Sequence, residues 1–297
     1  MVPLAVCGIY TGPGQPLTSG PMSVLLMTAI VGFGAILAGL LGSLTGIGGG
    51  VVIVPLLTLG FGVDIRYAVG ASLIAVIATS SGAAAAYVKE GYTNIRIGML
   101  LEVGTVAGAL AGSYLALILS PNFIAILFAV TVLLNALQSL RSRQDRRVEE
   151  SKLARKLRLS SSYPTAKGPA HYEVGWVPLG FAVMVLAGSL SALLGIGAGV
   201  MKVLAMDRAM GLPFKVSTTT SNFMIGVTGA ASAGIYLQRG YVEPVLTFPV
   251  VLGVLLGAWV GSRMFFAAST RSLRILFAVV VVTLALEMLY KGITGAL

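Results

Sequence analysis

Long apolar segments separated by short polar turns make up most of the chain. Each half opens with one full-length apolar segment, Val24 to Leu44 and Gly175 to Leu194. Because one helix of about 20 apolar residues crosses about 30 Å of hydrocarbon, this pattern predicts membrane-spanning helices. Six further long segments follow, Tyr67 to Val88, Arg96 to Leu119 and Asn122 to Leu140 in the first half, and Val216 to Gln238, Val242 to Met264 and Arg271 to Tyr290 in the second.

Two apolar segments are shorter than the others. Val51 to Val63 and Val200 to Leu212 each follow directly after a cluster of glycines. With a rise of 1.5 Å per residue, a helix of about 13 residues is only about 20 Å long. Each of these segments is therefore too short to be an ordinary span.

The two halves of the chain are copies of each other at a spacing of about 149 residues. The run from Gly46 to Gly50 matches the run from Gly195 to Gly199, and a later ladder of three glycines is repeated as well. The ladders are Gly104, Gly108 and Gly112, and Gly253, Gly257 and Gly261. The sequence thus divides into an N-terminal tail (1–22), a first transmembrane repeat (23–140), a basic loop (141–174) and a second transmembrane repeat (175–297).

The distribution of cations helps to choose the topology, because Lys and Arg are enriched on the cytoplasmic side. If the two short segments do not cross, there are eight spans in parallel halves, and 13 of the 20 cations lie inside. If they cross, the halves are inverted and 16 of the 20 lie inside. We therefore predict an all-α polytopic membrane protein with an inverted repeat and about ten membrane segments, with eight as the alternative.

Composition excludes a water-soluble globule. The chain is 57% hydrophobic and 10% charged, with a mean hydropathy of +0.94, whereas soluble domains carry roughly 25% charged residues. Half of the net charge of +10 lies in the 141–174 loop, which holds nine cations and four anions. Between apolar spans, such a cluster indicates a cytoplasmic loop beside anionic lipid headgroups rather than a nucleic-acid interface. We expect a multi-pass protein of the inner membrane.

Few residues offer covalent or metal chemistry. With Cys7 alone, no intrachain disulfide can form, and His171 lies in the basic loop. A membrane-embedded protease or metalloenzyme needs several such groups within its spans. We expect no enzyme activity, no cofactor and no metal, and a membrane-embedded enzyme is the weaker alternative.

The glycine clusters are the first candidate substrate site. A helix that begins within the membrane leaves its first N–H groups unpaired and concentrates positive charge there, which suits an anion. Short, glycine-interrupted segments in equivalent places of two halves are typical of the binding site of a secondary transporter. The candidate residues are Gly48, Gly49 and Gly50, and Gly197, Ala198 and Gly199. In the alternative interpretation, these glycines only allow close helix packing.

Lys202 is the second candidate. It lies inside the second short segment, and its counterpart in the first half is Ile53. An ionisable residue within a membrane segment is costly and points to function. We predict that Lys202 contacts an anionic substrate, the alternative being a lysine that extends to the membrane surface.

Hydroxyl and amide side chains provide the third candidate. The second half contains six consecutive polar residues from Ser217 to Asn222, which predict a hydrated cavity or an unwound turn. Their side chains can donate hydrogen bonds to the oxygens of an anion. The candidate ligands are Ser72 in the first half and Thr218, Thr219, Thr220, Ser221 and Asn222 in the second.

Two further features are assigned by their position in the long segments. Glu102 is the one carboxylate well inside a span, and it is a candidate for proton coupling or for pairing with a cation. The glycine ladders are predicted to be structural, because small residues let helices approach closely. The sequence does not settle the oligomeric state.

The paired motifs resemble the TauE/SafE family of sulfite exporters. The resemblance lies in Gly46 to Gly50 followed by Pro55, in Ala68 to Ser72, in Gly91-Tyr92, and in their second copies. It implies export of small sulfur-containing anions, such as sulfite or C2 sulfonates like sulfoacetate, driven by ion or proton gradients. The second half departs from the family pattern at Ala198, Lys202 and Leu204, which leaves the substrate open. A transporter of another small anion is the alternative.

Overall fold

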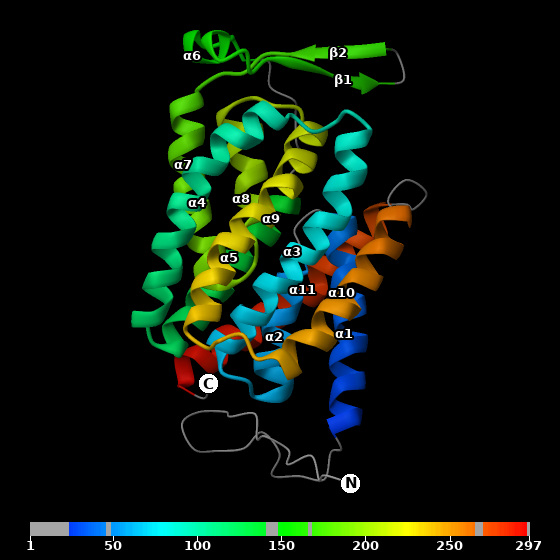
Figure 1. Cartoon of the computed structure of the whole chain (residues 1–297), viewed down its shortest axis with the longest axis vertical. Coiled ribbons are helices and arrows are strands. Elements are labelled where there is room, and N and C mark those ends of the chain that lie inside the picture. The colour runs from blue at the N-terminus through cyan, green and yellow to red at the C-terminus, as the bar shows by residue number, and fades with distance from the viewer. Residues whose placement is uncertain (1–23, 46–48, 141–147, 166–167, 265–269, 296–297) are drawn as a thin grey trace.

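The computed structural model describes residues 24–45, 49–140, 148–165, 168–264 and 270–295 (Figure 1). In the first half the helices are α1 (Val24–Thr45), α2 (Gly50–Phe61), α3 (Ile65–Lys89), α4 (Ile95–Ile118) and α5 (Pro121–Leu140). The second half has α7 (Val177–Leu194), α8 (Gly199–Leu204), the π-helical turn η1 (Ala205–Ala209), α9 (Phe214–Gln238), α10 (Pro244–Met264) and α11 (Thr270–Thr294).

Every predicted apolar segment is helical, with bounds that differ by only a few residues. Among the described residues, four helices are long and apolar enough to cross a membrane, α1, α4, α7 and α10. The expectation of an all-α membrane-embedded region is therefore confirmed. The inverted repeat and the number of spans remain predictions.

The helices of the two halves pair crosswise. The first helix of each half lies along the fourth helix of the other, so that α1 packs on α10 and α4 packs on α7. The third helices, α3 and α9, also contact each other, as do the fifth helices, α5 and α11. The two halves are thus interlocked rather than lying side by side as separate domains.

The glycine ladders allow these crosswise pairs to form, as the sequence predicts. A Cβ atom at Gly108 would overlap the carbonyl oxygen of Val185 on α7, and one at Gly257 would overlap the carbonyl oxygen of Ile36 on α1. At both places the glycine brings two helix backbones into direct contact, which a larger residue prevents.

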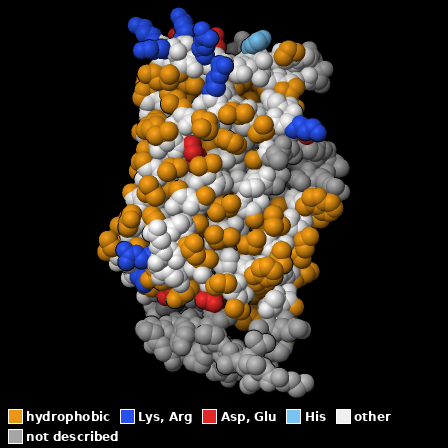
Figure 2. Space-filling model, in the orientation of Figure 1, with side chains coloured by type: hydrophobic (Ala, Val, Ile, Leu, Met, Phe, Trp, Pro, Cys, Tyr) orange, Lys and Arg blue, Asp and Glu red, His pale blue; other side chains and the backbone are white. Residues whose placement is uncertain are grey.

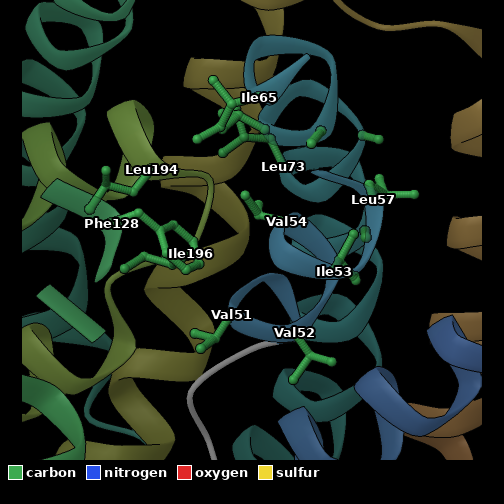
Figure 3. Close-up of a cluster of buried hydrophobic side chains, with 14 of the residues drawn as sticks. Val51, Val52, Ile53, Val54, Leu57, Ile65, Leu73, Phe128, Leu194 and Ile196 are labelled. Atoms are coloured by element: carbon green, nitrogen blue, oxygen red, sulfur yellow. The ribbon is translucent and has the colours of Figure 1, made fainter. Parts of the chain in front are cut away.

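The short helix α2 is part of the central hydrophobic core (Figure 3). Ile53, Val54 and Leu57 are fully buried on it, and Leu73 of α3 packs in the same cluster. Ile196, from the glycine-rich turn of the second half, belongs to this cluster as well. The core therefore crosses the boundary between the halves and surrounds the first short segment with apolar side chains.

The loop between the halves has a fold of its own, which composition did not predict. It contains α6 (Lys152–Lys156) and a hairpin of β1 (Ser161–Thr165) and β2 (Gly168–Tyr172), seen at the upper end in Figure 1. Asn94, just before α4, donates from Nδ2 to the carbonyl oxygen of Leu159 at 2.9 Å and to the Tyr172 hydroxyl at 2.8 Å. Burial raises the pKa of Tyr172, and its hydrogen bond with Asn94 acts in the opposite direction.

The molecular surface has the pattern expected of a membrane protein. In Figure 2, hydrophobic side chains are spread over the visible face, and a group of Lys and Arg side chains lies at the end that carries the loop. Many of the exposed side chains are large and apolar, including Phe33, Val103 and Trp259. Such a surface is suited to lipid rather than to water.

Candidate functional site

The first short segment is a regular helix. Gly49 is the N-cap of α2, and its carbonyl oxygen accepts hydrogen bonds from the backbone N–H groups of Val52 and Ile53. Gly62, in the left-handed conformation with φ 65°, ends the helix. Gly48, predicted to belong to the same N-terminus, lies outside the described residues.

The second short segment is less regular. Gly197 and Ala198 are both left-handed, with φ of 70° and 45°. That conformation costs little for glycine but is unfavourable for alanine. Helix α8 starts at Gly199, has six residues, and passes directly into the π-helical turn η1. A π-helical turn inside a helical segment is rare and is frequently found at functional sites.

The two glycine clusters meet at the boundary of the halves. A Cβ atom at Gly50 would overlap the carbonyl oxygen of Gly195 and would lie 2.6 Å from the Ser72 Oγ atom. The Ser72 hydroxyl donates to the same Gly195 carbonyl at 2.7 Å. This hydrogen bond connects α3 to the turn before α8. Because it uses the only proton of the Ser72 hydroxyl, the oxygen can accept further hydrogen bonds but cannot donate another.

Lys202 lies in the interior of the protein. Its side chain is completely buried, and Nζ donates to the Thr228 Oγ1 atom of α9 at 2.6 Å. A side chain that extended to the membrane surface would be exposed at its charged end. The structure therefore excludes that alternative.

Glu102 of α4 completes a buried chain of three polar side chains. Thr228 Oγ1 has one proton to donate, and Glu102 Oε1 at 2.6 Å is the nearer acceptor, with the carbonyl oxygen of Met224 at 3.0 Å as the second. Among the described residues, Glu102 Oε2 has no hydrogen-bond partner and no carboxylate oxygen lies within 4.0 Å of Lys202 Nζ. The ammonium and the carboxylate are thus linked through the threonine hydroxyl rather than directly. We call Lys202, Thr228 and Glu102 the buried polar triad.

The polar run from Ser217 to Asn222 is continuous α-helix within α9, so the unwound turn was a wrong expectation. Hydroxyl groups inside a helix can bond to nearby carbonyl groups and leave the backbone ladder intact. Thr219 Oγ1 donates at 3.0 Å to the carbonyl oxygen of Tyr92, and Thr220 Oγ1 accepts from the backbone N–H of Asn94 at 3.0 Å. These two threonines fix the connection between α3 and α4.

Ser221 contacts the second short segment, and Thr218 and Asn222 have polar atoms without a hydrogen-bond partner among the described residues. Ser221 Oγ donates to the carbonyl oxygen of Gly199 at 3.2 Å, which attaches α8 to α9. Among the described residues, Thr218 Oγ1 and Asn222 Nδ2 are buried without a hydrogen-bond partner. Thr218 and Asn222 are four residues apart, so they lie one above the other on the same strip of α9.

Thr228 was missed in the sequence, and Ser80, which belongs to the hydroxyl-rich stretch of the first half, was not among the candidate ligands. Thr228 lies seven residues after Ser221, which places both on the face of α9 that meets α8. That spacing could have revealed Thr228. Ser80 of α3 donates to the backbone carbonyl of Asn222. This contact depends on tertiary packing of α3 against α9, which the sequence pattern does not specify.

Comparison with known proteins agrees with this architecture. The family model described as "Sulfite exporter TauE/SafE" matches residues 4–288. The chain belongs to the TauE/SafE family. No solved structure matches it.

Three relatives of the TauE/SafE protein are similar over most of their length. "Probable membrane transporter protein YunE" of Bacillus subtilis (strain 168) is 26% identical, over 87% of this chain and 96% of its own. "Probable membrane transporter protein YdhB" of the same organism is 28% identical, over 76% and 86%. A "Probable membrane transporter protein" of Xylella fastidiosa (strain 9a5c) is 23% identical, over 91% and 98%. The family and these names describe membrane transport proteins, not enzymes.

Proposed function

We propose that this TauE/SafE protein is a secondary transporter that exports small sulfur-containing anions, such as sulfite or C2 sulfonates like sulfoacetate, across the inner membrane. The observation that carries the proposal is the complete burial of Lys202 in the short segment of the second half. A buried ammonium is expensive unless an opposite charge accompanies it. Glu102 reaches Lys202 only through Thr228, so an anion bound beside Lys202 would supply an opposite charge in direct contact, and the lysine would select anions over cations.

Free polar atoms on α9, the helix that packs on α8, support an oxyanion as substrate. Asn222 Nδ2 is a donor, Thr218 Oγ1 is a hydroxyl, and both are buried without partners among the described residues. Native proteins leave few such atoms unpaired. Sulfite and sulfonate groups present three oxygens that can accept hydrogen bonds from such donors. The sulfur specificity rests on the family description.

The crosswise pairing of the halves supports alternating access. In Figure 1, α1 starts at the end opposite the loop, whereas α7 starts beside the loop. Equivalent helices in opposite orientations are a property of inverted-repeat transporters, in which one part rocks against the other around a central site. The close contact between Gly50 and Gly195 joins the two halves, so we expect such movement to alter it.

A third feature supports the predicted orientation in the membrane. Lys152, Arg155, Lys156 and Arg158 are all exposed on the loop between the halves. Such cations favour contact with anionic lipid headgroups on the cytoplasmic side. Added phosphatidylglycerol should raise the thermal unfolding midpoint of the wild type more than that of the double variant Lys152→Glu, Lys156→Glu. Equal increases would contradict this contact.

Transport by the purified full chain in proteoliposomes tests the proposed function. We expect vesicles loaded with sulfite or ethanesulfonate to lose the anion faster than protein-free vesicles, with little transport of sodium or choline. Lys202→Met should reduce the rate at least about tenfold, the equivalent of about 1.4 kcal/mol. The control Lys89→Met removes an exposed charge at the end of α3 and should transport like the wild type.

Folding defects are separated from loss of transport by a second variant. Lys202→Met combined with Glu102→Gln removes both buried charges and leaves the interior neutral, so it should fold but not transport. Sulfur-anion transport at the wild-type rate by this folded double variant would contradict the role of Lys202. Transport of acetate but not of sulfur anions by the wild type would favour the alternative of another small anion.

A further inference from the structure

The buried polar triad holds one positive and one negative group in the protein interior. Lys202 and Thr228 are completely buried, and Glu102 is 6% exposed. The ion pair in this triad is electrically neutral as a whole. An anion that binds alone would give the site a net negative charge, which is costly in the interior. A positive charge must therefore bind together with the anion.

A proton on Glu102 is the positive charge that the structure can supply. Glu102 Oε2 is buried and has no hydrogen-bond partner among the described residues, so a lone pair remains free to take a proton. Thr228 links the carboxylate to the ammonium through bonds of 2.6 Å on either side. Neutralising the carboxylate therefore removes the charge that balances Lys202.

Few other ionisable groups lie on the elements around Glu102. Helix α7, which packs along α4, carries none. On α4 itself Arg96 is exposed near its start and Tyr114 lies three turns beyond Glu102. The remaining groups on packed elements are Lys202 on α8, Asp207 and Arg208 in η1, and Lys215 and Tyr236 near the two ends of α9. Of these, Lys202 is the group that shares a hydrogen-bonding atom with Glu102.

We propose that Glu102 is the resident counter-ion of Lys202, and that a transported monoanion replaces it when Glu102 takes up one proton. Before binding, the site holds an ammonium and a carboxylate. After binding, it holds an ammonium, a carboxylic acid and the anion, so its net charge is zero in both states. No covalent bond to the substrate forms, and the one proton gained is the one on Glu102.

The charge balance defines the substrate class more narrowly than the proposed function on which it rests. A monoanion, such as a sulfonate or hydrogen sulfite, leaves the site neutral with one proton. A dianion, such as sulfate or thiosulfate, would leave one uncompensated negative charge in the interior. The site therefore favours small monoanions, and one proton is bound with each of them.

Binding of ethanesulfonate by the purified full chain tests this coupling, because this monoanion does not itself titrate between about pH 5 and pH 8. Linkage requires that affinity increases about tenfold for each unit of decrease in pH where Glu102 is ionised in the free protein. In weakly buffered detergent solution, binding should also remove one proton from the solvent per bound anion. Thiosulfate should bind at least about tenfold more weakly at the same pH, since it adds a second buried charge.

Glu102→Gln imitates the protonated side chain and provides the decisive variant. It should bind ethanesulfonate at least as tightly as the wild type does at low pH, without pH dependence and without proton uptake. The control Glu90→Gln changes an exposed carboxylate and should behave like the wild type.

The outcomes separate the coupling from the proposed function. Ethanesulfonate binding by the wild type without proton uptake and with constant affinity across the pH range would overturn the coupling and leave anion transport in place. No binding by either the wild type or the folded Glu102→Gln variant at any pH would overturn the anion site as well. The proton-uptake measurement on the wild type needs no variant, so it decides the proposal even if Glu102→Gln does not fold.

Discussion

The two short segments occupy equivalent places in the repeat, yet they differ in chemistry. Helix α2 has 12 residues, starts regularly after Gly49, and buries Ile53 among apolar side chains. Helix α8 has six residues, follows two left-handed residues, continues as a π-helical turn, and buries Lys202 at the place of Ile53. The first segment is a structural element of the core, and the second places a charge inside it.

The difference extends to the partners of these residues. At the repeat spacing, Thr228 corresponds to Thr79, whose hydroxyl is buried and bonds to the carbonyl oxygens of Ala75 and Val76 within its own helix. Glu102 corresponds to Val251. The crosswise packing is shared by both halves, whereas the charged triad occurs once. A duplicated fold can thus keep its packing symmetry while only one of two equivalent sets of positions carries the charged residues.

The largest expected effect comes from giving the first segment the charge of the second. Ile53→Lys places an ammonium in an apolar core. The position equivalent to Glu102 is Val251, so no carboxylate accompanies this ammonium, and an unpaired buried charge costs about 3–5 kcal/mol. We expect a large loss of folded protein or a much lower thermal unfolding midpoint in detergent. Ile53→Met is the size-matched control and should cost less than about 1.5 kcal/mol. Equal stability of the two variants would mean that the first segment tolerates a charge as well as the second.

The next largest effect tests the close helix packing that the two halves share. Gly108→Ala and Gly257→Ala each place a methyl group against a backbone carbonyl of the paired helix, and overpacking of this kind costs about 1–3 kcal/mol. Thermal unfolding should show similar decreases for the two variants. Gly234→Ala has open space around it and should not lower stability. A decrease for Gly108→Ala without one for Gly257→Ala would contradict the equivalence of the α4–α7 and α1–α10 pairs.

The smallest effect concerns the hydroxyl groups at equivalent places. Thr228→Val leaves Lys202 Nζ and Glu102 Oε1 without their shared partner, so we expect a loss of about 1–2 kcal/mol of stability. Thr79→Val removes a hydroxyl that bonds only to carbonyl groups of its own helix, so it should cost less stability than Thr228→Val. Differential scanning measurements on both variants check this. If the two losses were equal, the hydroxyl of Thr228 would not hold the buried pair together.

The helical architecture could be predicted from the sequence because apolar segments and glycine ladders act through simple periodic contacts. Segment bounds, the position of the short segments and the close approach at Gly108 all follow from local pattern. The fold of the 148–174 loop could not be predicted, since it depends on contacts such as that between Asn94 and Tyr172.

The candidate site was predictable only in part. Lys202 and Glu102 stand out because charges are rare inside spans, but nothing in their spacing shows that they meet through Thr228. The polar run looked like an interruption of the helix, whereas its hydroxyls bond to neighbouring carbonyl groups and the backbone stays helical. Pairing between distant helices decides these features, and a single sequence does not contain it.

The central claim is that an anion binds at Lys202, and anion-dependent thermal stability tests it most directly. A ligand present at about 100 times its dissociation constant should stabilise the folded protein by about 2.7 kcal/mol. We predict that sulfite or ethanesulfonate raises the unfolding midpoint of the wild type and of Lys89→Met, but not that of Lys202→Met. An equal increase for the Lys202→Met variant would contradict the claim and place the anion elsewhere.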